Sequence, residues 1–117
     1  MNHGWIGVDL DGTLAVYDGW RGPLHIGPPV PAMVQRVKQW VIQDIKVRIM
    51  TARVSPSSLA LNDITLGEVT ELIDRWCLEY IGRTLPVTCE KDMEMVMLWD
   101  DRCTPVEKNT GRVLLAL

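Results

Sequence analysis

The fold of this chain follows from the stretch VDLDGTL at residues 8–14, where an apolar run ends in two carboxylates, Asp9 and Asp11. If residues 5–8 form a buried strand, both carboxylates lie where the chain leaves the sheet. Ligands of open α/β sheets bind at that end of the strands. Two carboxylates this close repel each other unless a cation lies between them. The stretch therefore predicts an α/β sheet with a ligand-binding edge that starts at Asp9.

A calcium-binding loop is one alternative, because oxygen-bearing side chains alternate at Asp9, Asp11 and Thr13. That loop requires glycine at its sixth position and glutamate at its twelfth. Those positions hold Leu14 and Trp20 here, so the sequence disfavours a calcium loop. An acidic turn with a purely structural role stays open.

Composition indicates one domain. A chain of 117 residues with 47% hydrophobic content is sufficient for one core, and we expect residues 1–117 to form it. The net charge of −3 gives no general attraction to nucleic acid or to an anionic membrane. Three cysteines without Cys-x-x-Cys spacing are typical of free thiols in a reducing cytosol. Without a recognisable export signal or membrane span, the expectation is a cytoplasmic protein with no membrane partner.

Short apolar segments and helical patterns alternate along the chain. Strands are expected at 5–8, 45–50, 95–99 and 112–117, with a short additional one at 86–89. This order predicts right-handed crossovers and a mainly parallel sheet whose strands all end at one edge.

Two helices are expected between these strands. Residues 31–42 begin with proline and place apolar residues at helical spacing. Thr65–Glu68 has the form of a capping box, and an apolar stripe follows it as far as Tyr80. Residues 54–62 fit a loop.

Residues 15–29, which we call the flap, are rich in glycine and proline and directly follow the carboxylate pair. We expect the flap to cover the site. Arg21 and His25 within it are candidates for substrate contacts beyond a phosphate, because arginine suits bidentate phosphate recognition. Trp20 is the candidate for stacking on a base.

Residues with oxygen or cationic side chains converge on the expected edge from three strands and one loop. They are Asp9, Asp11, Thr51, Arg53, Lys91, Asp100 and Asp101. Carboxylates that share Mg²⁺, beside a hydroxyl and an ammonium that hold a phosphate, account for this combination. Arg53 is a further candidate for substrate contact, whereas Arg102 fits a role in balancing the acidic pair before it.

Four segments, DLDGTL, the threonine after VRIM, the lysine of EKD and the acidic pair of LWDDR, resemble the motifs of the haloacid dehalogenase-like (HAD) hydrolase superfamily. The resemblance implies a three-layer α/β sandwich with a mainly parallel, Rossmann-like sheet. It also implies a magnesium-dependent phosphatase, a phosphomonoester hydrolase that forms an aspartyl-phosphate. No cap domain is expected, because the flap, one helix and one loop fill each interval between motifs.

The same resemblance assigns roles by position. Asp9 resembles the nucleophile and Asp11 the general acid/base, while Thr51 and Lys91 resemble the groups that hold phosphate. Gly12 and Thr13 belong to the first motif and are expected next to substrate. The residues implied as ligands of Mg²⁺ are Asp9, Asp11 through its backbone carbonyl, Asp100 and Asp101.

Other functions stay open at this stage. A receiver-like signalling module also combines aspartates, threonine and lysine around magnesium, although in a different order along the chain. A phosphate- or metal-binding module without catalysis is a third hypothesis. Among enzymes, the substrate is a phosphorylated small molecule or a macromolecular phosphate end. A polynucleotide 3′-phosphatase is included, although the acidic charge does not favour nucleic acid. The sequence leaves the oligomeric state open.

Overall fold

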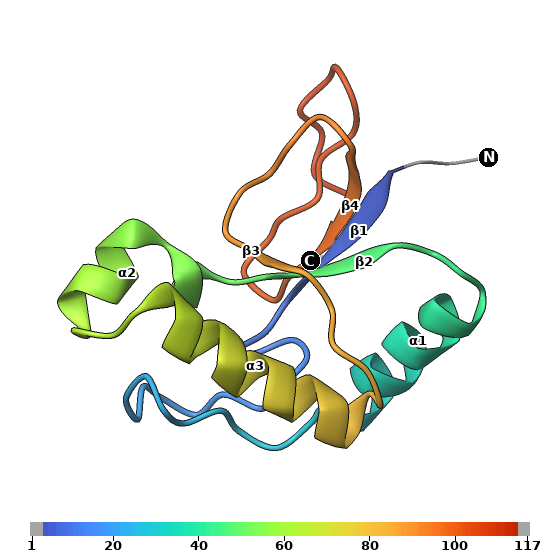
Figure 1. The fold of residues 1–117 in the computed structure, drawn as a ribbon. Helices are drawn as coiled ribbons and strands as arrows, with labels where there is room; N and C mark the ends of the chain where they lie inside the picture. The colour runs from blue at the N-terminus through green and yellow to red at the C-terminus, as the bar shows by residue number, and fades with distance from the viewer. Residues whose placement is uncertain (1–3, 115–117) are drawn as a thin grey trace.

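A computed structural model describes residues 4–114 of the chain and has an α/β architecture (Figure 1). Four parallel strands form one sheet in the order β3-β2-β1-β4. The strands are β1 (Trp5–Asp9), β2 (Val47–Met50), β3 (Val87–Thr88) and β4 (Met95–Trp99). The expected parallel, Rossmann-like sheet is therefore confirmed, including the short additional strand.

Helices connect β1 to β2 and β2 to β3, whereas a loop connects β3 to β4. The helices are α1 (Pro31–Ile42), the 3₁₀ turn η1 (Ala52–Val54), α2 (Pro56–Leu61) and α3 (Leu66–Tyr80). The capping box before α3 is confirmed, since Thr65 and Glu68 each accept a hydrogen bond from the other's backbone N–H. Among the helices of residues 4–114, none is long and apolar enough to cross a membrane.

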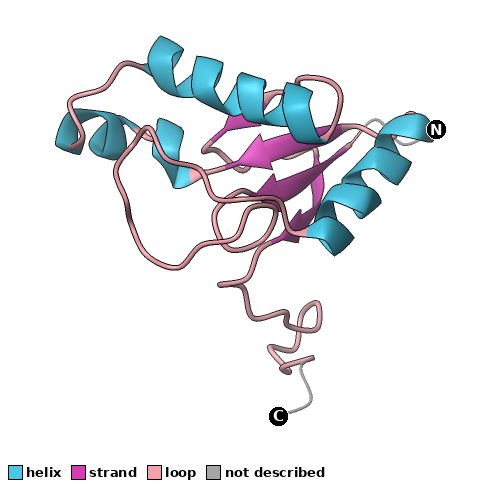
Figure 2. Cartoon of the chain, turned by 90° about the horizontal axis from the view of Figure 1, so that it is seen from below, coloured by secondary structure: helices cyan, strands magenta, loops and turns pink. Residues whose placement is uncertain are grey.

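The main core lies between the sheet and α1 and α3, which pack on the same face of it (Figures 1 and 2). Ile6 and Val8 of β1 point into this core, and the alternating Trp5 and Gly7 point to the opposite face. The loop before β4 contacts that opposite face, where Asp92 accepts a 2.9 Å hydrogen bond from the indole N–H of Trp5. One face of the sheet is thus covered by helices and the other, in part, by a loop.

Two expectations about secondary structure were wrong. Residues 54–62 are not a loop, because Ser55 caps the six-residue helix α2 with an oxygen that accepts from the Ser58 N–H. This helix buries no residue, so it lacks the apolar periodicity that identifies longer helices.

The expected strand at 112–117 is also absent from the residues that the structure describes, which end at 114. A turn at 108–110 instead folds the chain back on itself, and Val113 forms an isolated antiparallel bridge with Val106. An ion pair between Arg112 and Glu107 at 2.7 Å and a backbone hydrogen bond from Leu114 to Pro105 support this local pairing. Residues 115–117 lie outside the described part.

Candidate active site

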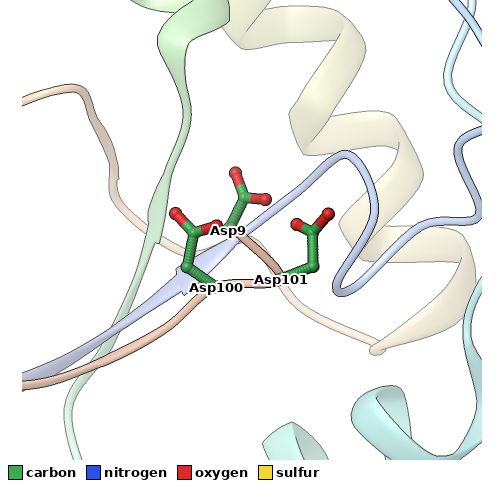
Figure 3. Close-up of side chains that lie close together, drawn as sticks. All are labelled: Asp9, Asp100 and Asp101. Carbon is green, nitrogen blue, oxygen red and sulfur yellow. The ribbon is translucent and has the colours of Figure 1, made fainter. Parts of the chain in front are cut away.

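Three carboxylates meet where the strand order reverses. Asp9 ends β1, and Asp100 and Asp101 directly follow β4, the neighbour of β1 in the sheet. One oxygen from each carboxylate lies within 4.8 Å of the others, and Figure 3 shows Asp9 between the other two. Crevices at such reversal points are the ordinary ligand sites of open α/β sheets. The expected convergence of Asp9 with the acidic pair is present.

Burial and repulsion strongly raise the pKa of the Asp9 carboxyl group. Desolvation, with smaller contributions from the neighbouring carboxyl groups of Asp101, Asp100 and Asp11, raises the pKa of Asp9 to about 8. An ionised carboxylate is therefore unfavourable here unless a positive charge compensates it. Three carboxylates supply the hard oxygen donors that Mg²⁺ prefers, so the residues present fit this ion.

We expect the pH dependence of stability to reveal this carboxylate when divalent cations are removed. Below its unfolded pKa of 3.8, Asp9 is protonated in both states and contributes nothing. Between 3.8 and about 8 the folded state binds more protons than the unfolded state, so stability falls as the pH rises. Above about 8 the loss is complete.

Thermal melts across this range, with a chelator, should therefore show wild type losing melting temperature relative to Asp9→Asn as the pH rises. Comparison of the two proteins isolates the contribution of Asp9 to the pH dependence of stability, because they share every other carboxylate. Added Mg²⁺ should raise the melting temperature of wild type most at alkaline pH, where the cluster is ionised. Parallel pH profiles for the two proteins would contradict the assignment.

Asp101 is fixed by the loop that follows β1. The hydroxyl of Thr13 accepts a hydrogen bond from the Asp101 N–H at 2.9 Å and lies 3.1 Å from its carboxylate oxygen Oδ1. Gly12 has a φ of +93°, and a Cβ built there would lie only 2.5 Å from Oδ2 of Asp101. Glycine is thus required at position 12 both by backbone conformation and by the close approach of the carboxylate.

Gly12→Ala should consequently weaken Mg²⁺ binding by at least about tenfold, as loss of groups that orient metal ligands does. Gly22→Ala is the matched control, because Gly22 also has a φ of +93° but has no atom within 4 Å of an added Cβ. Both variants should lose about 1–2 kcal/mol of stability through backbone strain. Titration calorimetry with Mg²⁺ distinguishes them, and equal affinities for the two variants would contradict a role for the contact with Asp101.

Asp11 lies apart from the three-carboxylate cluster and pairs with Arg53. The guanidinium donates Nε to Oδ2 at 2.7 Å and Nη2 to Oδ1 at 2.8 Å, which is a bidentate geometry. Exposure is only 7% for the arginine side chain and 20% for the aspartate. The orientation of the Asp11 carboxylate is therefore set by a buried cation 42 residues along the chain.

The flap is anchored to the site through the same arginine. Arg53 also donates hydrogen bonds to the backbone carbonyls of Pro23 and His25, at 3.3 and 2.7 Å. At the base of the flap, the indole N–H of Trp76 in α3 donates to the carbonyl of Gly27 at 2.9 Å. The flap thus lies beside the site and packs onto η1 and α3.

A cavity of about 650 Å³ opens over the cluster. The site residues predicted from sequence that line it are Asp9, Asp11, Trp20, Thr51, Arg53, Asp100 and Asp101. Thr51 is almost fully buried, and its hydroxyl oxygen accepts a hydrogen bond from the Arg53 N–H at 3.2 Å. The hydroxyl hydrogen of Thr51 is therefore available to a ligand oxygen in the cavity.

The other predicted residues lie outside this cavity lining. Thr13 instead forms hydrogen bonds with Asp101, and Gly12 lies in close contact with the Asp101 carboxylate. Lys91 is exposed in the loop after β3, and no contact with the three aspartates is observed for it. Arg21 pairs with Asp18 at 2.7 Å, and Arg21 and His25 line a much smaller pocket at the flap.

Sequence reasoning missed several lining residues. Arg102 lines the cavity and supplies a cation there, rather than only balancing the acidic pair. Tyr17 contributes a second aromatic ring beside Trp20, and the hydroxyl residues Ser55 and Ser58 lie at the start of α2. The position of Arg102 next to Asp101 in the sequence could have identified Arg102 as a site residue. The two serines could not be identified, because they belong to helix α2, which the sequence pattern did not reveal.

No protein-family model matches the sequence, and no curated protein matches it. Among solved structures, the chain is similar to a conserved protein from Bacteroides thetaiotaomicron, with a TM-score of 0.56 and 21% identity. The similarity covers 87% of this chain and 78% of that chain. Similarity at this level of identity demonstrates a shared fold, so inference about function rests on the chemistry of the site.

Proposed function

We propose that this protein is a magnesium-dependent phosphomonoester hydrolase of the HAD type that acts through an aspartyl-phosphate. The observation that carries the proposal is the position of Asp9 between Asp100 and Asp101 at the reversal point of the sheet, on the wall of an open cavity. Asp11, two residues further on, lines the same cavity.

The reaction divides into two displacements at phosphorus. In the first, a carboxylate oxygen of Asp9 attacks, and the bond to the leaving oxygen breaks. Asp11 donates a proton to that oxygen, which requires Asp11 to take up a proton and leave its bidentate pair with Arg53 before this step. In the second, Asp11 takes a proton from water, which attacks the aspartyl-phosphate and releases inorganic phosphate. The carboxylates of Asp9, Asp100 and Asp101 would hold Mg²⁺, and the ion would supply positive charge that offsets the charge of the transferring group.

The protein also offers groups that hold the phosphate. The buried hydroxyl of Thr51 donates to a phosphate oxygen, which is the role that the HAD resemblance implies for it. The same resemblance gives a cationic role to Lys91. Arg102 is an alternative cation for that role, because it lines the cavity and its side chain has no observed partner among the described residues.

The strand order supports the hydrolase over a receiver-like module. Receiver domains have the flavodoxin-like order 2-1-3-4-5, in which the third strand lies next to the first. Here β3 lies outside β2 and the neighbours of β1 are β2 and β4, which is the Rossmann order. The acidic pair Asp100–Asp101 thus lies next to Asp9 because it follows β4, which pairs with β1.

The test is phosphate release from a panel of phosphate esters, with Mg²⁺ and with a chelator. The panel includes nucleoside monophosphates, sugar phosphates, a phosphopeptide and a DNA with a 3′-phosphate. Multiple turnovers that depend on Mg²⁺ support the proposal. A stoichiometric acyl phosphate that persists would support the signalling function instead. Absence of both products, in protein that binds Mg²⁺, would leave the metal-binding module as the better account.

A further inference from the structure

The flap contributes two aromatic side chains to the cavity that contains the three aspartates. Tyr17 and Trp20 both line it, and each is 48% exposed. Other tryptophans are placed differently. Trp76 is buried in the core, and Trp40 packs edge to face against Trp99. Half-exposed rings on a cavity wall are available to a ligand in a way that the packed rings are not.

Trp20 is held in place from one side by Arg53. The guanidinium carbon lies 4.9 Å from the centre of the indole ring, within the range of a cation–π contact. Arg53 is itself fixed by its bidentate pair with Asp11 and by the flap carbonyls that it binds. The indole is therefore supported by a buried cation that its own hydrogen bonds hold in place. A ring that is already ordered loses little conformational entropy when a ligand stacks on it.

We propose that Tyr17 and Trp20 form a subsite for the planar base of a nucleoside monophosphate, whose phosphate lies at Asp9. This inference rests on the proposed function and names its substrate class. A volume of about 650 Å³ lies within the range of ligand sites for small molecules, and it extends from the aspartates to the flap. Ser55 and Ser58 line the same cavity and provide hydroxyls for the polar edges of a sugar or base.

The charges of the cavity favour a mononucleotide over a polynucleotide. Arginines are its two cations, and Arg53 is neutralised by Asp11. Only Arg102 then offers an unpaired positive charge, whereas a nucleic-acid strand carries a phosphate at every nucleotide and requires a row of cations. This arrangement therefore accommodates a ligand with a single phosphate and a single base.

The test compares two phosphate esters, one that carries a base and one that does not. Titration calorimetry with Mg²⁺ measures AMP and ribose 5-phosphate binding to Asp9→Asn, in which turnover is blocked. AMP should bind more tightly than ribose 5-phosphate. Adding Trp20→Leu should weaken AMP binding by about tenfold, the order expected for loss of one stacked base, and leave ribose 5-phosphate unchanged. Trp20→Phe, which keeps an aromatic ring, should retain most of the affinity for AMP.

Leu24→Ala is the matched control, because Leu24 is an exposed flap residue that does not line the cavity. It should change neither affinity. Equal binding of both ligands to Asp9→Asn, or an equal loss of both on Trp20→Leu, would overturn the subsite. These outcomes test the subsite separately from the catalytic proposal. If the protein releases phosphate but binds AMP and ribose 5-phosphate equally, the hydrolase proposal holds and the subsite is rejected. If AMP binding depends on Trp20 but no phosphate is released, the subsite holds and the hydrolase proposal is rejected.

Discussion

Asp9→Asn should lower Mg²⁺-dependent phosphate release by about 10⁴-fold or more, since removing a covalent nucleophile typically costs this much or more. The substituted amide has nearly the same shape but cannot form the acyl phosphate. Its stability should change in the opposite direction. Without metal above about pH 7, the variant should melt at a higher temperature than wild type, because burial and three neighbouring carboxyl groups disfavour the ionised form of Asp9. Steady-state kinetics and thermal melts of the same preparations measure both effects.

A gain in stability with a loss of activity separates chemistry from folding. Asp44→Asn is a suitable control, because Asp44 is exposed and has a left-handed φ of 61° that asparagine also tolerates. That variant should match wild type in both measurements. An active Asp9→Asn enzyme would reject the covalent mechanism, even if the three-carboxylate cluster binds Mg²⁺.

Arg53→Met should reduce the free energy of unfolding by about 3–5 kcal/mol, the usual cost of leaving one partner of a buried ion pair unpaired. The change leaves the Asp11 carboxylate without its bidentate donor and removes the donors to the carbonyls of Pro23 and His25. For a chain of this length, the melting temperature should fall by roughly 10–20 °C. Chemical denaturation and thermal melts measure the two quantities.

Arg75→Met supplies the contrast. The Arg75–Glu71 contact on α3 is slightly shorter, 2.6 Å against 2.7 Å for Arg53–Asp11, but its side chains are 74% and 64% exposed. Water already solvates these charges, so its loss should cost less than about 0.5 kcal/mol. The double variant Asp11→Asn/Arg53→Met should recover part of the stability that Arg53→Met loses, because no unpaired carboxylate then remains at position 11. Similar losses for the two arginine variants would contradict the structural role of the buried pair.

Local patterns were sufficient for most of the framework. Apolar runs that end in polar residues located β1, β2 and β4, and the capping box located the start of α3. The errors have a common cause. Helix α2 and the segment at 112–114 bury few apolar groups, so periodicity carries little information about them, and their conformations depend on caps and turn contacts.

By itself, the sequence determined that Asp9 and the pair Asp100–Asp101 would lie at one edge of the sheet. Parallel strands end at the same edge, so the residues that directly follow them share that edge. The structure added that β4 lies next to β1, which brings the three carboxylates together. Only the tertiary structure decided which partners complete the site. Arg53 rather than a metal binds the Asp11 side chain, Thr13 holds Asp101 from 88 residues away, and Lys91 is not among the residues that line the cavity. Such pairings depend on side-chain direction and burial across distant segments, which no local periodicity specifies.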